Sequence, residues 1–330
     1  MSATVTKVRP SEQIDESLAV FAADVHDDLQ KQPRQLQPKY FYDALGSHLF
    51  ESICHLPWYL ITRAERRLLE EHAADMLAPL EDLTTIIELG CGSGAKLALL
   101  AEGVRKRAHP VLVRLIDISA TALDLSERTL GRLPHVSVVG RHEATYDAGL
   151  REATRPRPSH GSTLVLFLGS NLGNLRPAVA DAFLREVRSA LRPGDGFLLG
   201  ADLVKPEKDL LLAYGDPLGV TAAFNKNLLD RINRELGGDF DLSAFEHRPR
   251  WNPEASRVES HLVSTQAQKV TIPEADLSVD FAEGESIWTE SSYKYTPDQV
   301  AELGAAAGFR RERQWIEPES QFSLTLFFAE

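Results

Sequence analysis

A glycine-rich stretch at positions 86–96 constrains the fold of this chain more than any other feature. Two β-branched residues run into Glu88, and glycines then stand at every second position, Gly90, Gly92 and Gly94. The pattern predicts a buried strand, a tight turn and a helix start, because glycine adopts positive φ and lets a ligand approach the backbone. The helix N-terminus adds unpaired N–H donors, so we favour a nucleotide-like ligand over a simple strand-to-helix turn.

An acidic residue closes the next predicted strand. Asp117 follows residues 111–116 and lies roughly twenty residues beyond the glycines, where a carboxylate can hold both hydroxyls of a ribose. A helix N-cap or a solvated strand end would also explain Asp117, but its position favours ribose. The adenosine of NAD, FAD or S-adenosylmethionine would fit equally, so a dinucleotide-dependent oxidoreductase remains an alternative at this point.

Strands and helices alternate through the middle of the chain. We predict strands near 84–89, 111–117, 135–140, 162–168 and 196–202, and helices near 62–78, 95–106, 119–131 and 177–191. The first helix is expected to begin with Thr62 as N-cap and Glu65 as its capping-box partner. Strands that are apolar throughout indicate a parallel sheet with both faces covered. The fold class is therefore α/β, a Rossmann-like doubly wound sheet that binds ligands at the carboxyl ends of its strands.

The pattern changes after Asp202. Helices over 206–214 and 220–236 are followed by short strands near 257–265, 268–272, 277–281 and 286–295, which indicate a small α+β insertion. A helix over 297–307 and strands near 313–316 and 322–328 would close the parent sheet with a terminal hairpin. We expect a main domain over 64–203 plus 295–330, a second domain over 18–63 plus 204–294, and a tail over 1–17.

Composition excludes several classes of function. The net charge is −12 without a long basic run, which argues against nucleic-acid binding. Two cysteines, Cys54 and Cys91, provide neither a disulfide framework nor a four-cysteine metal site, and the ten histidines are scattered, so no metal is expected. The N-terminus lacks an apolar signal core, and no run reaches membrane-spanning length. A cytoplasmic protein without a membrane partner is expected.

Three further segments carry polar or aromatic groups that invite a functional interpretation. The fourth predicted strand runs into Gly169-Ser170-Asn171-Leu172-Gly173-Asn174, where we favour a turn role for Asn171 and a functional one for Asn174. If residues 288–295 form a strand, Glu290, Ser292 and Lys294 share one face, either as a site or as the polar face of an edge strand. The aromatic segment 39–59 is either a packed cap or a wall of a substrate pocket.

From about Leu36 to the C-terminus, these motifs resemble the histidine Nα-methyltransferases of ergothioneine biosynthesis, which use S-adenosylmethionine. The resemblance rests on six short motifs: Lys39-Tyr40-Phe41-Tyr42-Asp43, Ile87-Glu88-Leu89-Gly90, Phe167-Leu168-Gly169-Ser170 with Gly173-Asn174, Gly219-Val220-Thr221-Ala222-Ala223-Phe224-Asn225, Phe240-Asp241-Leu242, and Thr289-Glu290 with Ser292. It implies a class I methyltransferase that converts L-histidine to Nα,Nα,Nα-trimethylhistidine (hercynine), acting as a monomer. Another α-amino acid as substrate, or a cofactor-binding module without catalysis, remain the alternatives.

The resemblance also assigns roles to individual residues. The cofactor would be held by Gly90, Gly92, Lys96 and Asp117, and the substrate by Tyr42, Phe50, Tyr59, Gly169, Asn174, Tyr214, Glu290 and Ser292. Within the second set, Tyr42, Gly169, Asn174 and Tyr214 would hold the amino and carboxylate groups, Phe50 would line the pocket, and Tyr59, Glu290 and Ser292 would face the imidazole. Tyr42 and Asn174 are the candidate catalytic residues, because either could relay the proton that the amine loses.

Two positions depart from the family pattern. Gly140 is followed by Arg141-His142-Glu143 where an acid that contacts adenine is expected, so Thr145-Tyr146-Asp147 is the alternative adenine contact. Ser260 stands where a methionine is expected near the substrate, which leaves room for rings larger than imidazole.

Overall fold

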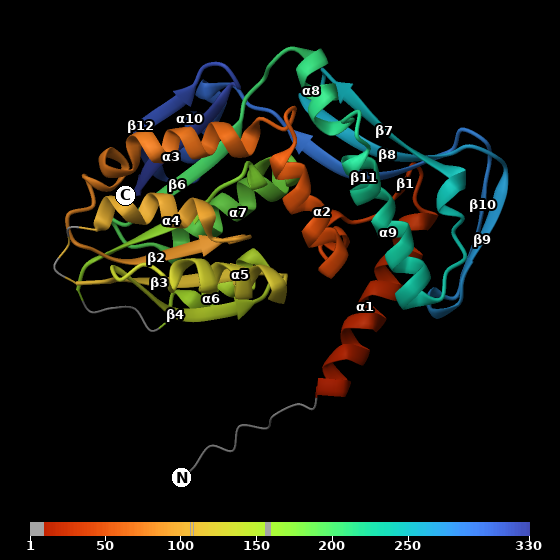
Figure 1. Cartoon of the computed structure of the whole chain (residues 1–330), viewed down its shortest axis with the longest axis horizontal. Helices are drawn as coiled ribbons and strands as arrows, with labels where there is room; N and C mark the ends of the chain where they lie inside the picture. Colours follow the sequence, from red (N-terminus) through yellow and green to blue (C-terminus); the bar gives the residue numbers. More distant parts are fainter. Residues whose placement is uncertain (1–9, 106, 108, 156–159) are drawn as a thin grey trace, which may run out of the picture.

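A computed structural model describes residues 10–105, 107, 109–155 and 160–330 of the protein (Figure 1). The described chain forms a seven-stranded sheet, a four-stranded sheet and a two-stranded hairpin. The seven-stranded sheet has the order β12-β13-β6-β5-β2-β3-β4. Its strands are β2 (Leu83–Leu89), β3 (Val111–Asp117), β4 (Val136–Glu143), β5 (Ser162–Phe167), β6 (Gly196–Asp202), β12 (Phe309–Glu317) and β13 (Phe322–Ala329).

The order of the larger sheet reverses between β2 and β5. Strands β6, β5, β2, β3 and β4 are parallel, and β13 and β12 close the sheet as an antiparallel hairpin, which confirms the predicted doubly wound fold. In such sheets ligands bind where the strand order reverses, outside the carboxyl ends of the strands. The loops after β2 and β5 therefore define the place where a site is expected.

Helices cover both faces of this sheet because neighbouring residues of its strands point to opposite sides. Ile86 of β2 packs in one apolar cluster with the first group of helices, and Ile87 packs in another with the second group. The first group is α3 (Ile61–Leu77), α4 (Ala95–Ala101) and α5 (Ala120–Leu130), and the second is α6 (Tyr146–Ala153), α7 (Pro177–Ala190) and α10 (Pro297–Ala306). Both residues are at most 1% exposed, as expected for a strand between two layers of helices.

The smaller sheet has the order β1-β11-β8-β7 and lies at the opposite end of the molecule (Figure 1). Its strands are β1 (Arg34–Gln35), β11 (Ser286–Tyr293), β8 (Arg257–Ser264) and β7 (Phe245–Asn252), and β9 (Gln268–Ile272) pairs with β10 (Leu277–Phe281). The helices of this part are α1 (Pro10–Gln30), α2 (Ala44–His55), α8 (Glu207–Tyr214) and α9 (Val220–Leu236). Phe41, in the short 3-10 helix η1 (Pro38–Phe41), stacks on Phe224 of α9 and ties the N-terminal segment to the insertion.

Several predicted boundaries differ from the structure. Helix α1 begins at Pro10, within the segment expected to be a tail, and residues 1–9 of that segment lie outside the described residues. The expected capping box at Thr62 is wrong, because Leu60 is the N-cap of α3 and makes no side-chain cap hydrogen bond. Glu65 therefore does not cap the helix, and its carboxylate pairs with Lys96 instead. Residues 34–35 form β1, which pairs in parallel with β11.

Candidate active site

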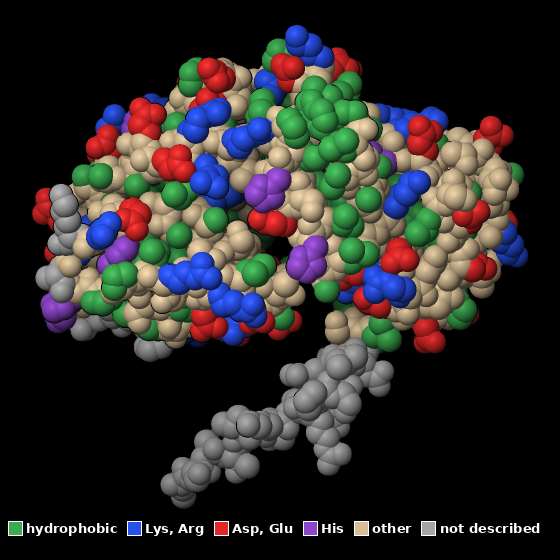
Figure 2. Space-filling view, in the orientation of Figure 1, with side chains coloured by type: hydrophobic (Ala, Val, Ile, Leu, Met, Phe, Trp, Pro, Cys, Tyr) green, Lys and Arg blue, Asp and Glu red, His purple; other side chains and the backbone are tan. Residues whose placement is uncertain are grey.

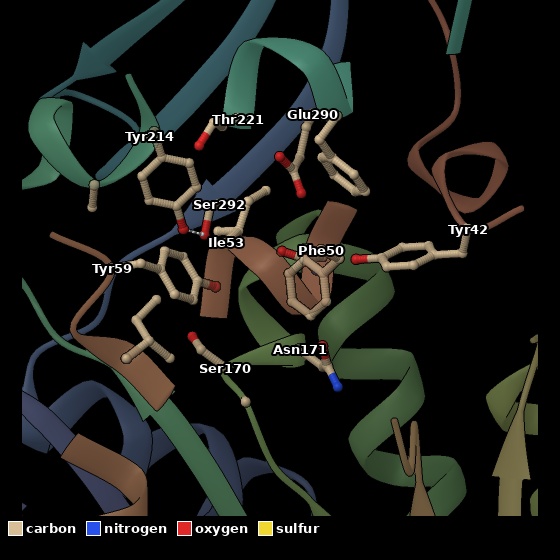
Figure 3. Close-up of a pocket in the computed structure, with 15 residues that line it drawn as sticks. Tyr42, Phe50, Ile53, Tyr59, Ser170, Asn171, Tyr214, Thr221, Glu290 and Ser292 are labelled. Atoms are coloured by element: carbon tan, nitrogen blue, oxygen red, sulfur yellow. Dashed lines mark hydrogen bonds between the residues drawn. The ribbon is translucent and has the colours of Figure 1, made fainter. Parts of the chain in front are cut away.

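A pocket opens where the two parts of the molecule meet, and the surface is hollowed there (Figures 2 and 3). It encloses about 510 Å³ of empty space, its open mouth included. The lining residues come from segments far apart in the sequence: Tyr42, Phe50, Ile53, Tyr59, Ile61, Gly169, Ser170, Asn171, Asn174, Ala213, Tyr214, Thr221, Phe224, Glu290 and Ser292. All the residues predicted to hold the substrate are among them, so the structure brings that set together in one place.

The loop after β5 is shaped to reach this pocket. Gly169 has φ 76° and Ser170 has φ 62°, so the chain turns sharply into the 3-10 helix η3 (Asn171–Asn174). The Ser170 hydroxyl accepts a hydrogen bond from the backbone N–H of Asp202 at 2.9 Å, which anchors the turn to β6. A Cβ at Gly173 would lie 2.7 Å from the carbonyl oxygen of Tyr293, so glycine is needed for η3 to pack against β11.

Aromatic rings form one wall of the pocket. Phe50 is the central ring, with its centroid 5.7 Å from that of Tyr42, 6.5 Å from Tyr59 and 5.9 Å from Phe224. The aromatic segment 39–59 therefore lines the pocket and also packs against its neighbours, so both interpretations that the sequence left open apply. Burial raises the pKa of Tyr42 well above its ordinary value, and the nearby Glu290 adds to the rise. The Tyr42 phenol thus stays protonated.

Glu290 places a carboxylate at the other side of the pocket (Figure 3). Burial raises its pKa to about 7, although the charge of Lys294 and a hydrogen bond from Ser260 act in the opposite direction. Ser260 is the residue opposite Glu290 in the β8–β11 pairing and is 3% exposed. The departure at position 260 thus lies directly beside the carboxylate that is expected to read the substrate ring.

A buried charge cluster lies beneath Glu290 and Ser292. Lys294 is 1% exposed, and its Nζ lies 2.8 Å from Asp202 Oδ2, 2.9 Å from the Tyr214 hydroxyl and 2.9 Å from Ser292 Oγ. The Tyr214 hydroxyl donates to Ser292 Oγ at 2.7 Å, as the dashed line in Figure 3 shows. On the other side of the cluster, Lys205 pairs with Asp202 Oδ1 at 2.5 Å. The expected shared face of Glu290, Ser292 and Lys294 is confirmed, with Lys294 beneath the pocket.

The glycine loop lies beside this pocket. Gly90, Gly92 and Gly94 have φ values of 76°, 51° and 72°, the left-handed conformation that the spacing predicts. A Cβ at Gly90 would lie 3.0 Å from Asn171 Nδ2 and 3.2 Å from the Tyr146 hydroxyl. Asn171, for which we favoured a turn role, therefore stands between the loop and the pocket.

Asp117 is held by the backbone at the end of β3. Its Oδ2 accepts from the N–H of Gly92 at 3.1 Å, and its Oδ1 accepts from the N–H of Ser119 at 2.9 Å. Burial raises the pKa of Asp117, while these N–H groups lower it. The Cys91 thiol also donates weakly to Oδ2, with its sulfur 3.9 Å away.

Lys96, whose side chain is 25% exposed, forms an ion pair with the buried Glu65 that the sequence did not reveal. Lys96 Nζ lies 2.5 Å from Glu65 Oε2, and the two Glu65 oxygens accept from the N–H of Gly169 at 2.9 and 3.0 Å. The Glu65 side chain is 0% exposed. Burial lowers the pKa of Lys96, but the neighbouring Glu65 carboxylate raises it, and the net change is upward. The pair joins α3 to the helix after the glycine loop and to the turn after β5.

Glu88 is a second residue that the sequence interpretation passed over. It is 2% exposed at the end of β2, and its Oε2 has no hydrogen-bond partner within the described chain. Burial raises its pKa well above its ordinary value. The sequence did offer a signal for this residue, an acid at the end of a buried strand just before the glycines. A carboxylate is seldom buried without a partner, so a ligand partner could have been inferred.

The sequence lacks the acid that the family pattern places directly after Gly140, and the structure shows what stands there instead. Strand β4 extends to Glu143, which pairs opposite Asp117 at the end of β3. Arg141 points away to the surface, where it forms ion pairs with Asp124 and Glu127 of α5. Tyr146 packs edge-on against Phe167. An acid thus stands at the end of β4, three positions after Gly140.

The part of the chain that the structure describes offers neither a cluster of metal ligands nor a helix that could span a membrane. Within residues 10–105, 107, 109–155 and 160–330, no group of three or more His, Cys, Asp or Glu side chains could hold a metal ion. In the same part of the chain, every helix is too short or too polar to cross a membrane.

Comparison with known proteins agrees with this geometry. The family described as "Histidine-specific methyltransferase, SAM-dependent" matches residues 21–329. The chain is 40% identical over 314 residues to a histidine N-alpha-methyltransferase of Mycolicibacterium smegmatis, covering 94% of this chain and 96% of that protein. It is 30% identical to ergothioneine biosynthesis protein 1 of Neurospora crassa over 86% of this chain and 32% of that protein. It is 27% identical to the L-tryptophan methyltransferase trpM of Psilocybe serbica, covering 97% and 96%. This chain belongs to the family of histidine-specific, S-adenosylmethionine-dependent methyltransferases.

Proposed function

We propose that this enzyme transfers methyl groups from S-adenosylmethionine to the α-amino nitrogen of L-histidine, giving the trimethylated product of the ergothioneine route. One observation carries the proposal. A single pocket holds uncharged polar groups at the loop after β5 and a carboxylate with a hydroxyl on β11, and it adjoins the glycine loop through Asn171 and Gly90. A small amino acid with a polar ring matches that distribution of groups.

The residues around the glycine loop fit S-adenosylmethionine. Asp117 would accept from two ribose hydroxyls, one on Oδ1 and one on Oδ2 in place of the weak contact from the Cys91 thiol. Glu88 is a buried carboxylate with an unpartnered oxygen, which suits an α-ammonium group. Gly90 and Gly92 leave the space that a side chain would fill, and Lys96 stands at the turn between loop and pocket. The bound cofactor supplies a methyl group on a sulfonium, which an amine lone pair can displace.

Histidine has three polar groups, its amine, its carboxylate and its imidazole, and each is assigned to a part of the pocket. Tyr42, Gly169 and Asn174 would hold the amine, and Tyr214, whose O–H donates to Ser292 Oγ, would lie beside the carboxylate. At the far end, Glu290 and Ser292 would face the imidazole, with Tyr59 beside them. Holding the amine at a fixed place supplies much of the catalysis, because a displacement needs its reacting atoms in line.

The amine must lose a proton before its lone pair is available. Because burial keeps the Tyr42 phenol protonated, Tyr42 would act as a relay that accepts one proton while passing on its own. Asn174 does not titrate and would hold a water or the amine in place. Repeated transfer ends in a quaternary ammonium, which the faces of Tyr42, Phe50 and Tyr59 would stabilise.

We also propose that the enzyme works as a cytoplasmic monomer with two domains. Both cysteines, Cys54 and Cys91, are free, as expected in a reducing compartment. The strands of the two sheets come from separate sets of segments, 83–202 with 309–329 and 34–35 with 245–293, which supports the division into a cofactor part and a substrate part.

The proposal is tested by incubating the purified protein with S-adenosylmethionine and a panel of amino acids, followed by mass spectrometry. Histidine is expected to be methylated with the highest catalytic efficiency. Preferential methylation of tryptophan or another amino acid would change the substrate assignment. Cofactor binding without methyl transfer to any amino acid would reduce the protein to a binding module.

A further inference from the structure

The buried charge cluster beneath the pocket determines whether Ser292 donates or accepts a hydrogen bond to the substrate. We propose that Lys294 is a positioning residue that makes Ser292 a donor, so that the site accepts neutral imidazole with its unprotonated nitrogen toward Ser292. This inference rests on the proposed function, since it names the form of histidine that the pocket selects.

The ammonium group of Lys294 can only donate, and it has three N–H bonds. Its three partners are Asp202 Oδ2, the Tyr214 hydroxyl and Ser292 Oγ, at 2.8, 2.9 and 2.9 Å. Each N–H is therefore engaged, and the group is fully buried beside a carboxylate. Lys294 has no donor left for a ligand, so it acts on the substrate through its two hydroxyl partners.

The hydroxyl of Ser292 receives two hydrogen bonds from this cluster. One comes from Lys294, and the other from the Tyr214 hydroxyl at 2.7 Å. A serine hydroxyl has two acceptor lone pairs and one donor, so both lone pairs are occupied. The only group that Ser292 can present to the pocket is its O–H, and the ring atom facing it must be an acceptor.

Glu290 imposes the complementary condition. As a carboxylate it can only accept, and it lies two residues from Ser292 on the same face of β11. A ring that satisfies both needs one N–H and one unprotonated nitrogen, which is a single tautomer of neutral imidazole. Imidazolium has no acceptor, and the rings of tryptophan and phenylalanine have none either.

The cluster also provides a matched control. Lys205 pairs with the other oxygen of Asp202 and donates to the carbonyl of Ser320, away from the pocket. Lys294→Met and Lys205→Met each remove one buried ammonium from the same carboxylate and leave the other in place. Only Lys294→Met frees a lone pair of Ser292, which can then turn its O–H back toward Tyr214.

The experiment compares catalytic efficiency for histidine with that for the two pyrrolylalanine isomers, in which one ring nitrogen is kept as N–H and the other is replaced by C–H. Wild type is expected to prefer histidine strongly, because a C–H facing Ser292 leaves its O–H unpaired. Lys294→Met should reduce that preference by about tenfold or more, whereas Lys205→Met should keep the wild-type ratio. Methylation of histidine by wild type tests the proposed function separately.

Two results would overturn the inference. One is an unchanged preference in a folded Lys294→Met, and the other is an equal loss of preference in Lys205→Met, which would indicate a structural effect of the cluster. If Lys294→Met does not fold, Ser292→Ala decides the question with Lys294 in place. The preference must fall there too, and a wild-type ratio in Ser292→Ala would exclude Ser292 as the donor.

Discussion

At the scale of single residues, Glu290 links the pocket to pH. Its pKa is raised from 4.5 to about 7 by burial, so the folded protein holds a proton there that the unfolded chain releases. Stability contributed by this group is therefore complete below pH 4.5 and is lost as the pH rises through 7. The carboxylate that the ring of the substrate needs is thus kept at a cost in stability.

We expect Glu290→Gln to be more stable than wild type at pH 8, by on the order of 2 kcal/mol, with a difference that narrows toward pH 5. Urea unfolding at the two pH values measures it. Glu283→Gln, at an exposed position near the same strand, serves as the control and should show no such change with pH. A difference for Glu290→Gln that is the same at both values would contradict the raised pKa.

Asp117 is expected to hold the ribose. Asp117→Ala should weaken binding of S-adenosylmethionine by about 1–3 kcal/mol, because two hydroxyls lose their acceptor. Calorimetric titration measures the affinity. Asp124→Ala is the control, because Asp124 is a half-exposed carboxylate on α5 that pairs with Arg141 of β4. An Asp117→Ala variant with wild-type affinity would remove Asp117 from the cofactor site.

Asn174 and Tyr214 are expected to act on the substrate alone. Asn174→Ala and Tyr214→Phe should lower the catalytic efficiency for histidine on the order of tenfold to a hundredfold, because the first removes a partner of the amine and the second removes the hydroxyl that donates to Ser292. Both variants should bind cofactor as wild type does in the same titration. Folded variants that retain full efficiency would show that the assignment of the amine and carboxylate is wrong.

At the scale of elements, α3 is fixed to the site by one side chain. Glu65 accepts from Gly169 after β5 and pairs with Lys96 of α4. A Cβ at Gly200 of β6 would lie 2.4 Å from Glu65 Oε1, so the close approach of α3 to β6 depends on that glycine. The buried carboxylate of α3 thus contacts α4, β6 and the turn after β5.

Glu65→Gln should destabilise the protein by about 3 kcal/mol, because it leaves the Lys96 charge without its buried partner. The matched control is Glu70→Gln on the same helix, which breaks the surface pair of Glu70 with Arg66 and should cost less than about 1 kcal/mol. Urea unfolding of both variants compares them. Equal losses would show that the Glu65–Lys96 pair is no stronger than a surface one.

The sequence predicted most elements, and its failures have physical causes. Strands β2, β3, β5 and β6 were predicted nearly to the residue because they are apolar runs buried under helices on both faces. Strand β7 was missed since it is an edge strand with exposed Glu246, Arg248 and Arg250 and contains Pro249, all of which disguise a strand. Glu65 was misread because its spacing from Thr62 matches a capping box by coincidence.

At the scale of the whole molecule, the pocket exists only because distant segments converge. Tyr42, Asn174 and Ser292 come from three parts of the chain, and short-range patterns could not reveal that they are neighbours. The resemblance to the methyltransferase family assigned all three residues to the substrate, and the fold brings them together in one pocket. The ion pair of Lys294 with Asp202 had no sequence signal, because the two residues are far apart in the sequence and are brought together beside the pairing of Leu203 with Tyr295.

This pocket is expected to methylate the α-amino nitrogen of histidine. The most direct measurement is tandem mass spectrometry of the product formed from L-histidine and S-adenosylmethionine by the full-length protein, with fragment ions that locate each methyl group. We predict that the final product carries all its methyl groups on the α-nitrogen and none on the ring, because the ring is engaged by Glu290 and Ser292 at the far end of the pocket. Methyl groups on a ring nitrogen, or no methylated histidine at all, would contradict this account.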